Sequence, residues 1–574
     1  MTNDLNRNAR WTRLISEELQ RGGVAHVVLC PGSRNSPLVF ALAAMFGTNV
    51  ISHIDERSAG FIALGLIRST GKPAAVCVTS GSALANLLPA VVEADAAGLP
   101  LIVISADRPW EAHDCGAQQT MRQRGIFTAF VRRELALGEP GDDDRQLRAL
   151  RSQVSALAQI TDGPTHLNVP LRDPLPPLPD ANWRPAEVSP EAEHGRSAGF
   201  TVEATPTLVP QLERTAWLRP GLRGLIVVGC PTGLADLRPT VIELARATGF
   251  PVWADGPSGV RDDAVPQLIT THDALVGGAL ADGVPELVIQ IGQIPLTRAA
   301  YEWLDRQRCP WIALAATRNL DALGRAWLSI GAGWQAAARQ LGEWLAAGDA
   351  AWRTRWTTAE ATARRVLGER TAALGWSESL VIHRTLRQPR FAFVHLASSM
   401  AIRHANLHLP PSARPVHSNR GVNGIDGTLG TFIGLSLGQR QGGKPARGLL
   451  LIGDLAFLHD LPALAAAGPA RGAVVLLNNG GGGIFDYLPV AQLPGYRELI
   501  RTSHTRTFGA AAELFGLAYH ACRQESELAA ALDAAGQGEG LHLIECHLTG
   551  LDPVVQHRAL IRACGGVDLN DRSA

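Results

Sequence analysis

The sequence has 574 residues, which exceeds the size of a single hydrophobic core and predicts about three or four domains. Basic and acidic residues both number 53, and the resulting zero net charge argues against a nucleic acid or another polyanion as a partner. No apolar segment reaches the ~18–20 residues that span a bilayer, and the N-terminal segment lacks the apolar core of a secretion signal. The eight cysteines stand singly, so neither a disulfide framework nor a zinc site is expected. We therefore expect a cytoplasmic protein with no membrane span.

Residues 1–180 form the first predicted domain. Short apolar segments alternate in it with helical stretches such as 81–98, and this alternation is typical of a parallel sheet covered on both faces. The predicted strands are 24–30, 74–79 and 99–105. A proline-rich segment at 172–185 cannot continue a helix or a central strand, so we expect it to be a linker between this domain and the next.

The same alternation of strands and helices recurs twice more along the chain. A central domain is predicted over residues 200–345 and a C-terminal domain over residues 365–574. One long helical run, 334–367, leads from the central domain into the last one. The predicted strands of these two domains are 223–230, 248–256, 285–292, 390–397, 446–454, 472–479 and 540–548. We therefore predict an α/β fold of three doubly wound parallel-sheet domains.

Polar side chains follow two consecutive predicted strands of the C-terminal domain. Asp454 comes directly after the first strand, and Asn478 and Asn479 end the second, before four glycines. Each element alone also fits an ordinary turn after a strand. The spacing from Asp454 to Asn479, however, fits one strand–helix–strand unit, which brings both residues to the edge where α/β sheets bind ligands. A carboxylate, an amide oxygen and a backbone carbonyl are oxygen ligands suited to Mg²⁺, and glycines let the main chain approach a diphosphate.

Glu56 stands where the predicted strand 49–55 passes into the predicted helix 56–70. Judged locally, it is a carboxylate favoured by the helix dipole, with Asp55 as the N-cap. A carboxyl group bonded to a ring nitrogen of an aminopyrimidine can also promote proton exchange at that ring. Paired with the distant metal element, Glu56 therefore predicts a thiamine diphosphate site. In that site Asp454 and Asn479 hold a divalent ion on the diphosphate, and Glu56 acts on the aminopyrimidine.

Four segments of the chain share a resemblance that spans all three predicted domains. They are 30–38, 105–127, 418–431 and 454–485. Through them the chain resembles thiamine diphosphate-dependent enzymes, and within these the 2-succinyl-5-enolpyruvyl-6-hydroxy-3-cyclohexene-1-carboxylate synthase family. Leucine after the metal aspartate, at Leu455, is usual in that family. The resemblance implies the three-domain fold of the decarboxylases and carboligases that use this cofactor. It also implies Mg²⁺, with Mn²⁺ as an alternative, held by Asp454, Asn479 and the Gly481 carbonyl.

The resemblance further implies a reaction, its partners and an assembly. The enzyme would be a transferase of menaquinone biosynthesis that decarboxylates 2-oxoglutarate and adds the remaining four-carbon unit to isochorismate. In the superfamily, domains of different subunits meet at the active site, so Glu56 and Asp454 are expected to come from two chains. A homodimer is then the smallest active unit, and a homotetramer is the larger alternative.

The site residues implied by the resemblance fall into two groups. Those at the cofactor are Glu56, Ser418, Ile425, Asp454, Leu455, Asn479, Ile484 and Phe485, with Ile425 as an apolar wedge and Ile484 and Phe485 lining the reaction chamber. Those at the substrates are Ser33, Arg34, Arg108, Gln119, Arg298 and Arg403 for isochorismate, and Ser399 and Arg420 for 2-oxoglutarate. Any one of the five arginines also fits a structural ion pair. As a group they suit substrates whose carboxylates need bidentate partners.

The sequence departs from the family pattern at two positions, and two alternative functions are compatible with parts of it. Gly483 stands where the family commonly has a polar residue, often Gln, and Arg298 stands where some relatives have Lys. Within the enzyme class, the alternative is another 2-oxo acid carboligase or decarboxylase, similar to acetolactate synthase. From a different class, the alternative is a non-catalytic binding protein on the same fold. The presence of Glu56, Asp454 and Asn479 together argues against it.

Overall fold

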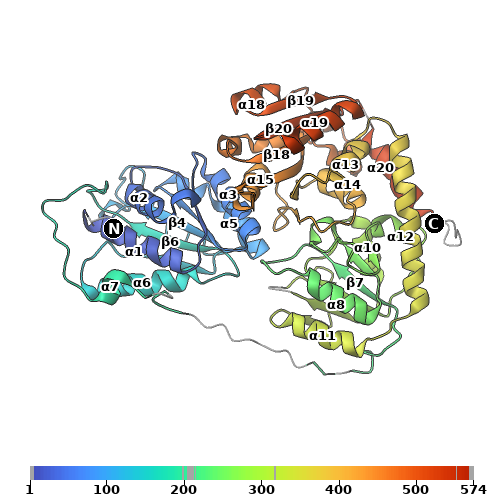
Figure 1. Cartoon of the computed structure of the whole chain (residues 1–574), viewed down its shortest axis with the longest axis horizontal. Coiled ribbons are helices and arrows are strands. Elements are labelled where there is room, and N and C mark those ends of the chain that lie inside the picture. The colour runs from blue at the N-terminus through green and yellow to red at the C-terminus, as the bar shows by residue number, and fades with distance from the viewer. Residues whose placement is uncertain are drawn as a thin grey trace. The chain divides into compact units, whose positions relative to one another are not determined.

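A computed structural model describes residues 5–196, 199–202, 212–213, 215–315, 319–550 and 552–567. Its contacts divide the chain into two compact units. Unit 1 comprises Met1–Thr205, Asn419–Ala446 and Asp460–Ala470, and unit 2 comprises Pro206–Ser418, Arg447–His459 and Arg471–Ala574. The units contain three six-stranded sheets, each parallel throughout, and the predicted fold class is thereby confirmed (Figure 1). The three domain boundaries themselves stay a prediction.

The sheet of unit 1 has the order β2-β1-β3-β4-β6-β5. Strands β3 and β4 are buried along their whole length, as expected for a sheet covered on both faces. The strands are β1 (His26–Leu29), β2 (Val50–Ser52), β3 (Ala74–Val78), β4 (Leu101–Asp107), β5 (Arg133–Ala136) and β6 (Thr165–Pro170). The helices before residue 200 are α1 (Arg7–Arg21), α2 (Ser36–Phe46), α3 (Glu56–Thr70), α4 (Ser82–Ala85), α5 (Leu88–Ala97), α6 (Asp144–Ala158) and α7 (Pro190–His194).

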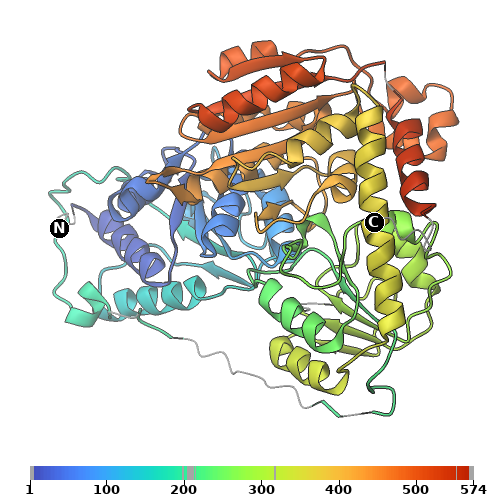
Figure 2. The same cartoon turned by 45° about the vertical axis from the view of Figure 1, so that its right-hand side comes forward.

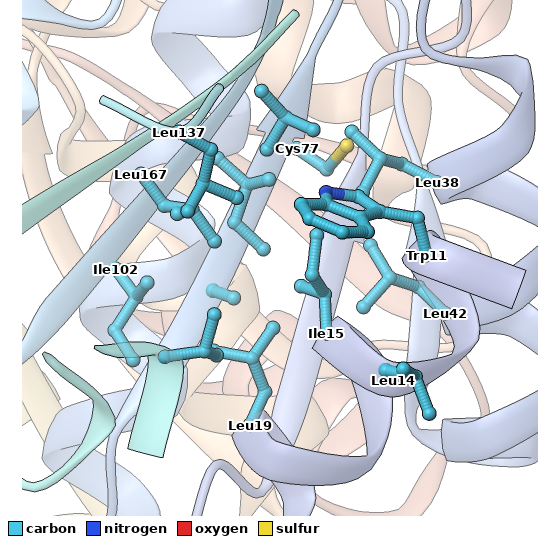
Figure 3. Packing of buried hydrophobic residues seen from close by; sticks show 14 of the residues in the cluster. Trp11, Leu14, Ile15, Leu19, Leu38, Leu42, Cys77, Ile102, Leu137 and Leu167 are labelled. Atoms are coloured by element: carbon cyan, nitrogen blue, oxygen red, sulfur yellow. The ribbon is translucent and has the colours of Figure 1, made fainter. Parts of the chain in front are cut away.

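One face of this sheet is covered by an apolar cluster built on α1. Trp11, Ile15 and Leu19 follow each other at helical spacing and are all buried. They pack with Leu38 and Leu42 of α2 and with residues of the sheet (Figure 3). This packing fixes the strand ends from which the loops of unit 1 emerge.

The predicted helix 81–98 is two helices, α4 and α5. Pro89 explains the interruption, because a proline removes a backbone N–H and its ring clashes with the carbonyl of the preceding turn. Proline is tolerated only in the first turn of a helix, so a new helix, α5, starts at Leu88. The break leaves Asn86 between the two helices.

Unit 1 also includes a helix from the last third of the sequence, α15 (Thr428–Gly438), which packs on α3 (Figure 1). A short antiparallel pair, β15 (Arg440–Gln441) and β16 (Lys444–Pro445), follows it. The two helices approach closely where Gly65 meets Gly434. A Cβ on Gly65 would lie 2.1 Å from the Thr431 carbonyl oxygen and 2.8 Å from the Gly434 Cα. Only glycine fits this helix crossing.

We expect Gly65→Ala to destabilise the protein, because the added methyl group has no space at the α3–α15 contact. Overpacking of this kind costs about 1–3 kcal/mol of unfolding free energy. Thermal unfolding followed by circular dichroism measures the change. Gly368→Ala is the matched control, since its Cβ would meet no atom within 4 Å and alanine favours the helix by about 0.5–1 kcal/mol. An unchanged midpoint for Gly65→Ala would contradict the described packing.

Unit 2 contains the other two sheets, with the orders β12-β11-β10-β7-β8-β9 and β14-β13-β17-β18-β20-β19. The strands of the first are β7 (Gly224–Val228), β8 (Val252–Ala254), β9 (Leu268–Ile269), β10 (Leu287–Ile291), β11 (Trp311–Leu314) and β12 (Leu328–Ile330). Those of the second are β13 (Phe393–Leu396), β14 (Val416–His417), β17 (Arg447–Gly453), β18 (Arg471–Asn478), β19 (Ala518–Cys522) and β20 (Leu541–His547).

In unit 2, the region predicted as one long helical run, residues 334–367, differs from the prediction. It consists of two helices, because Asp349 caps the second by accepting a hydrogen bond from the Trp352 N–H, while Ala347 has a φ of 56°. The second, α12, is the long yellow helix of Figure 2. The helices are α8 (Arg238–Thr248), α9 (His272–Leu275), α10 (Arg298–Arg306), α11 (Trp334–Trp344), α12 (Ala350–Ala373), α13 (Glu378–Leu386), α14 (Met400–His408), α16 (Asp454–His459), α17 (Tyr496–Leu499), α18 (Gly509–Leu514), α19 (Glu525–Gln537) and α20 (Pro553–Gly565).

Among the described residues, no helix is both long enough and apolar enough to cross a membrane.

Candidate active site

Asp454 lies at the carboxyl end of β17, where it begins α16, and is 2% exposed. Its Oδ2 accepts hydrogen bonds from the backbone N–H groups of Gly480 and Gly481, at 2.8 and 2.9 Å. Its Oδ1 accepts a hydrogen bond from the Leu455 N–H at 2.7 Å. Burial raises the pKa of Asp454, and these N–H donors oppose that rise. The carboxylate is thus joined to the glycine loop that follows β18.

Asn479 and Gly481 of this loop supply two further oxygen atoms that could bind a cation together with Asp454. The Asn479 Oδ1 is buried and accepts no hydrogen bond from the described residues, while its Nδ2 donates to Glu378 at 3.3 Å. The Gly481 carbonyl accepts a hydrogen bond from the Gly483 N–H, and a carbonyl oxygen has a second lone pair that can bind a cation. Gly481 has a φ of 139°, and a Cβ there would lie 2.7 Å from the Arg501 carbonyl. A buried carboxylate, an unpartnered amide oxygen and a carbonyl fit a hard divalent cation.

Two basic residues that sequence reasoning missed hold this loop in place. Arg501 donates to the carbonyls of Gly480 and Asn479, at 2.9 and 3.1 Å, and pairs with Asp486. The His504 Nε2 lies 3.5 Å from the Asp454 Oδ2, and its backbone N–H donates to Gly480. Both residues belong to the segment RTSHTRTF, 501–508, whose basic character was the available signal. By occupying two other carbonyls, Arg501 leaves the Gly481 carbonyl as a potential ligand.

Glu378 is a third missed residue, and it sets the orientation of the Asn479 amide. It is buried, and burial raises its pKa to about 7, against the opposing hydrogen bond from Asn479. Its Oε1 lies 3.3 Å from the His404 Nδ1, and burial lowers the pKa of His404 to about 3, so this imidazole is neutral. In the sequence Glu378 follows a capping Ser377 and looks like an ordinary first-turn carboxylate.

Glu56 is the first residue of α3 in unit 1 and is half-buried. The predicted N-cap is confirmed, because the Asp55 side chain accepts a hydrogen bond from the Ser58 N–H at 3.1 Å. The Glu56 Oε2 accepts a hydrogen bond from the Asn86 Nδ2 at 3.3 Å. Burial raises the pKa of the nearby Cys30 thiol, and the charge of Glu56 adds to that rise. The carboxyl group therefore stands at a helix N-terminus and accepts a hydrogen bond from the Asn86 side chain.

Two of the predicted substrate arginines lie near each other in unit 1. Arg34 is 8% exposed and donates to the Leu171 carbonyl at 2.8 Å. Burial lowers the pKa of Arg34, and the charge of Arg108 adds to that lowering. Arg108 also lines a cavity of about 560 Å³. The other basic and aromatic residues around that cavity are Trp110, His113, Arg122 and Arg124.

Ser33 and Gln119 belong to the loops beside these arginines. Ser33 precedes α2, and its carbonyl accepts a hydrogen bond from the Ser36 N–H. Gln119 has a φ of 54°, and its Nε2 donates to the Ser80 carbonyl at 3.0 Å. The exposed Gln119 side chain is therefore tied to the loop after β3.

Unit 2 holds the other predicted substrate residues on its helices. Ser399 precedes α14 with a φ of 70°, which is strained for a residue other than glycine, and its carbonyl accepts from Arg403 at 2.7 Å. These two residues are thus brought together. Arg298 begins α10 elsewhere in the unit, is 85% exposed at its side chain, and pairs with Glu302 at 2.6 Å.

The remaining predicted residues divide between the units. Arg420 and Ile425 lie in an irregular loop of unit 1, residues 419–427, where Ile425 is 38% exposed. Ser418 is buried in unit 2 and donates to the Leu396 carbonyl at 2.8 Å. Ile484 and Phe485 lie just after the glycine loop, in a 3-10 helix at Gly483–Tyr487. The metal-loop residues and Glu56 therefore belong to different compact units.

Three doubly wound sheets, a donor set for a divalent ion and a carboxylate at the start of α3 define a thiamine diphosphate-dependent enzyme. The family model described as "Thiamine pyrophosphate enzyme, N-terminal TPP binding domain" matches residues 10–126. The chain is 34% identical to a 2-succinyl-5-enolpyruvyl-6-hydroxy-3-cyclohexene-1-carboxylate synthase of Roseiflexus castenholzii, over 97% of this chain and 99% of the relative. Synthases of the same name from Myxococcus xanthus and Chloroflexus aurantiacus are 35% and 36% identical, over 98% and 96% of this chain and 98% and 95% of each relative. The chain belongs to this synthase family.

Proposed function

We propose that the protein is a 2-succinyl-5-enolpyruvyl-6-hydroxy-3-cyclohexene-1-carboxylate synthase that acts in menaquinone biosynthesis. It removes carbon dioxide from 2-oxoglutarate and joins the remaining four-carbon unit to isochorismate. The observation that supports this most is the similarity to synthases of that name over nearly the full length of both chains. An acetolactate synthase-like carboligase would act on small substrates that do not need several pocket arginines.

Asp454, Asn479 and the Gly481 carbonyl bind Mg²⁺ in this proposal, or Mn²⁺ in its place. Support comes from the unpartnered Asn479 Oδ1 beside the buried carboxylate loop. When bound, thiamine diphosphate supplies the electron sink that decarboxylation of a 2-oxo acid needs. Glu56 holds a proton at a ring nitrogen of the pyrimidine. Ser418, Leu455, Ile425, Ile484 and Phe485 contribute the remaining contacts to the cofactor.

Arginines and small polar side chains bind the substrate carboxylates. Ser33, Arg34, Arg108, Gln119, Arg298 and Arg403 face isochorismate, and Ser399 and Arg420 face 2-oxoglutarate. The electrostatic effect of Arg108 on Arg34 supports this grouping. Burial and then the charge of Arg108 lower the pKa of Arg34, Asp173 at 3.6 Å from the Arg34 Nη1 opposes that effect, and a substrate carboxylate would oppose it further. Gly483 stands where a polar side chain is common in the family, and a Cβ there would lie 3.0 Å from the Asn479 Nδ2.

The active assembly in this proposal is a homodimer in the cytoplasm, or a tetramer built from two such dimers. It brings Glu56 of one subunit to Asp454 of another. Size-exclusion chromatography with light scattering distinguishes these states from a monomer. A monomer with full activity would contradict the proposed shared site.

A product assay tests the proposed reaction directly. The purified protein is incubated with thiamine diphosphate, Mg²⁺, 2-oxoglutarate and isochorismate, and each component is omitted in turn. We expect mass spectrometry to detect an adduct heavier than isochorismate by one succinic semialdehyde unit, and only in the complete mixture. Carbon dioxide release without an adduct would exclude isochorismate as the acceptor. Absence of both, with the cofactor bound, would contradict the proposal.

A further inference from the structure

Glu93 is a buried carboxylate in the middle of α5 that the proposed reaction does not use. It is 1% exposed, and α5 satisfies the backbone around it. The Arg68 Nη2 lies 3.8 Å from the Glu93 Oε1. Burial raises the pKa of Glu93, and the charge of Arg68 opposes the rise. Burial of a carboxylate costs free energy unless partners compensate for it. The hydrogen-bond partners of Glu93 therefore indicate what this carboxylate does.

Those partners are two consecutive backbone N–H groups of a loop more than three hundred residues away. The Gly421 N–H donates to the Glu93 Oε1 at 2.9 Å, and the Val422 N–H donates to the Oε2 at 2.8 Å. Residues 419–427 have no regular secondary structure, so these donors have no partner in a helix or sheet. The carboxylate takes that role with one oxygen for each donor.

The contact with Glu93 is too close for any residue but glycine at position 421. A Cβ on Gly421 would lie 2.7 Å from both the carbonyl oxygen and the Oε2 of Glu93, and 2.9 Å from the Ala96 Cβ. The Val422 side chain is 50% exposed and adds little apolar packing. The loop is therefore held here by its backbone, against the Glu93 carboxylate.

Arg420 immediately precedes these two anchored residues, and its charge acts on Glu93. We propose that Glu93 is a positioning residue that fixes the 419–422 backbone, and so holds Arg420 where it binds a carboxylate of 2-oxoglutarate. This inference rests on the proposed function, which gives Arg420 its substrate. Glu93 itself touches neither substrate nor cofactor in this account.

The first test replaces the carboxylate by an amide of the same size. Glu93→Gln retains one acceptor but turns an NH₂ group towards the second loop N–H. We expect the KM for 2-oxoglutarate to rise roughly ten- to a hundredfold, which is the usual effect of losing a charge-assisted hydrogen bond. The KM for isochorismate should change by less than about threefold. Asp95 lies on the same helix as Glu93 and pairs with Arg132. Asp95→Asn, which breaks that pair, is the matched control and should leave both KM values unchanged.

Hydrogen–deuterium exchange of the apo protein gives a second readout that needs no substrate. We expect a peptide covering residues 418–427 to exchange faster in Glu93→Gln than in the wild type or in Asp95→Asn. If Glu93→Gln does not fold, Gly421→Ala keeps the buried charge and displaces the loop from it. The same selective rise in the KM for 2-oxoglutarate is expected for that variant.

Three results decide between the two proposals. An inactive wild type overturns the proposed function, whatever the Glu93 variant does. An active wild type, with an unchanged KM for 2-oxoglutarate and unchanged exchange in Glu93→Gln, overturns the positioning role alone. An equal rise in both KM values, or a fall in kcat only, also overturns it, because a general loss of structure would act on both substrates.

Discussion

Glu56→Gln is expected to lower turnover by roughly 10²–10⁴-fold, the usual contribution of a positioned acid–base group. Glutamine retains the length and shape of the side chain and can still accept the hydrogen bond from Asn86. It cannot exchange a proton at a ring nitrogen of the pyrimidine, because an amide does not titrate near neutral pH. The loss should therefore fall on kcat, measured by the release of carbon dioxide from 2-oxoglutarate.

Binding of the cofactor should survive this substitution. Glu56 lies in unit 1, whereas the proposed metal ligands lie in unit 2, so the Mg²⁺-dependent affinity for thiamine diphosphate should change little. Titration followed by tryptophan fluorescence measures that affinity. Glu369→Gln breaks an exposed pair with Arg365 on α12. It serves as the control, because it makes the same Glu-to-Gln change on a helix outside the proposed site. Wild-type turnover in Glu56→Gln would contradict the assigned role of this carboxylate.

The main features of the fold followed from the sequence, because buried parallel strands are nearly continuous apolar runs. All eleven strands predicted in the three domains overlap with strands of the structure. Two predicted helices, 81–98 and 334–367, were wrong in extent, since Pro89 and the cap at Asp349 divide them. Composition alone did not reveal these breaks, because alanine and leucine continue on both sides.

The candidate site was predictable only where its residues follow a local rule. Asp454 and Asn479 each end a strand, and one strand–helix–strand unit separates them. Glu378 and Arg501 obey no such rule, because they reach the Asn479 backbone or amide from positions 101 and 22 residues away. The contact between Glu93 and Gly421 spans 328 residues and joins a helix to an irregular loop, which no sequence pattern marks.

Asp454→Asn should remove metal-dependent binding of the cofactor, in contrast to Glu56→Gln. The substitution takes the negative charge from the proposed cation site. It also turns an NH₂ group towards one set of backbone donors, because both carboxylate oxygens accept N–H groups of the loop or of Leu455. Loss of a ligand and distortion of the Gly481 carbonyl should lower the affinity for the metal by more than about a hundredfold, beyond the ~10–100-fold typical of outer-shell changes.

Thermal unfolding with and without Mg²⁺ and thiamine diphosphate measures this loss without reference to turnover. A ligand present at about 100 times its Kd stabilises the folded state by about 2.7 kcal/mol, so the wild type should unfold at a higher temperature when loaded. Asp454→Asn should show no such shift, whereas Asp533→Asn, which breaks an exposed pair with Arg390, should behave as the wild type. Glu56→Gln should keep the shift and lose turnover. A wild-type shift in Asp454→Asn would place the cation elsewhere, and turnover in both variants would favour a different reaction centre on this fold.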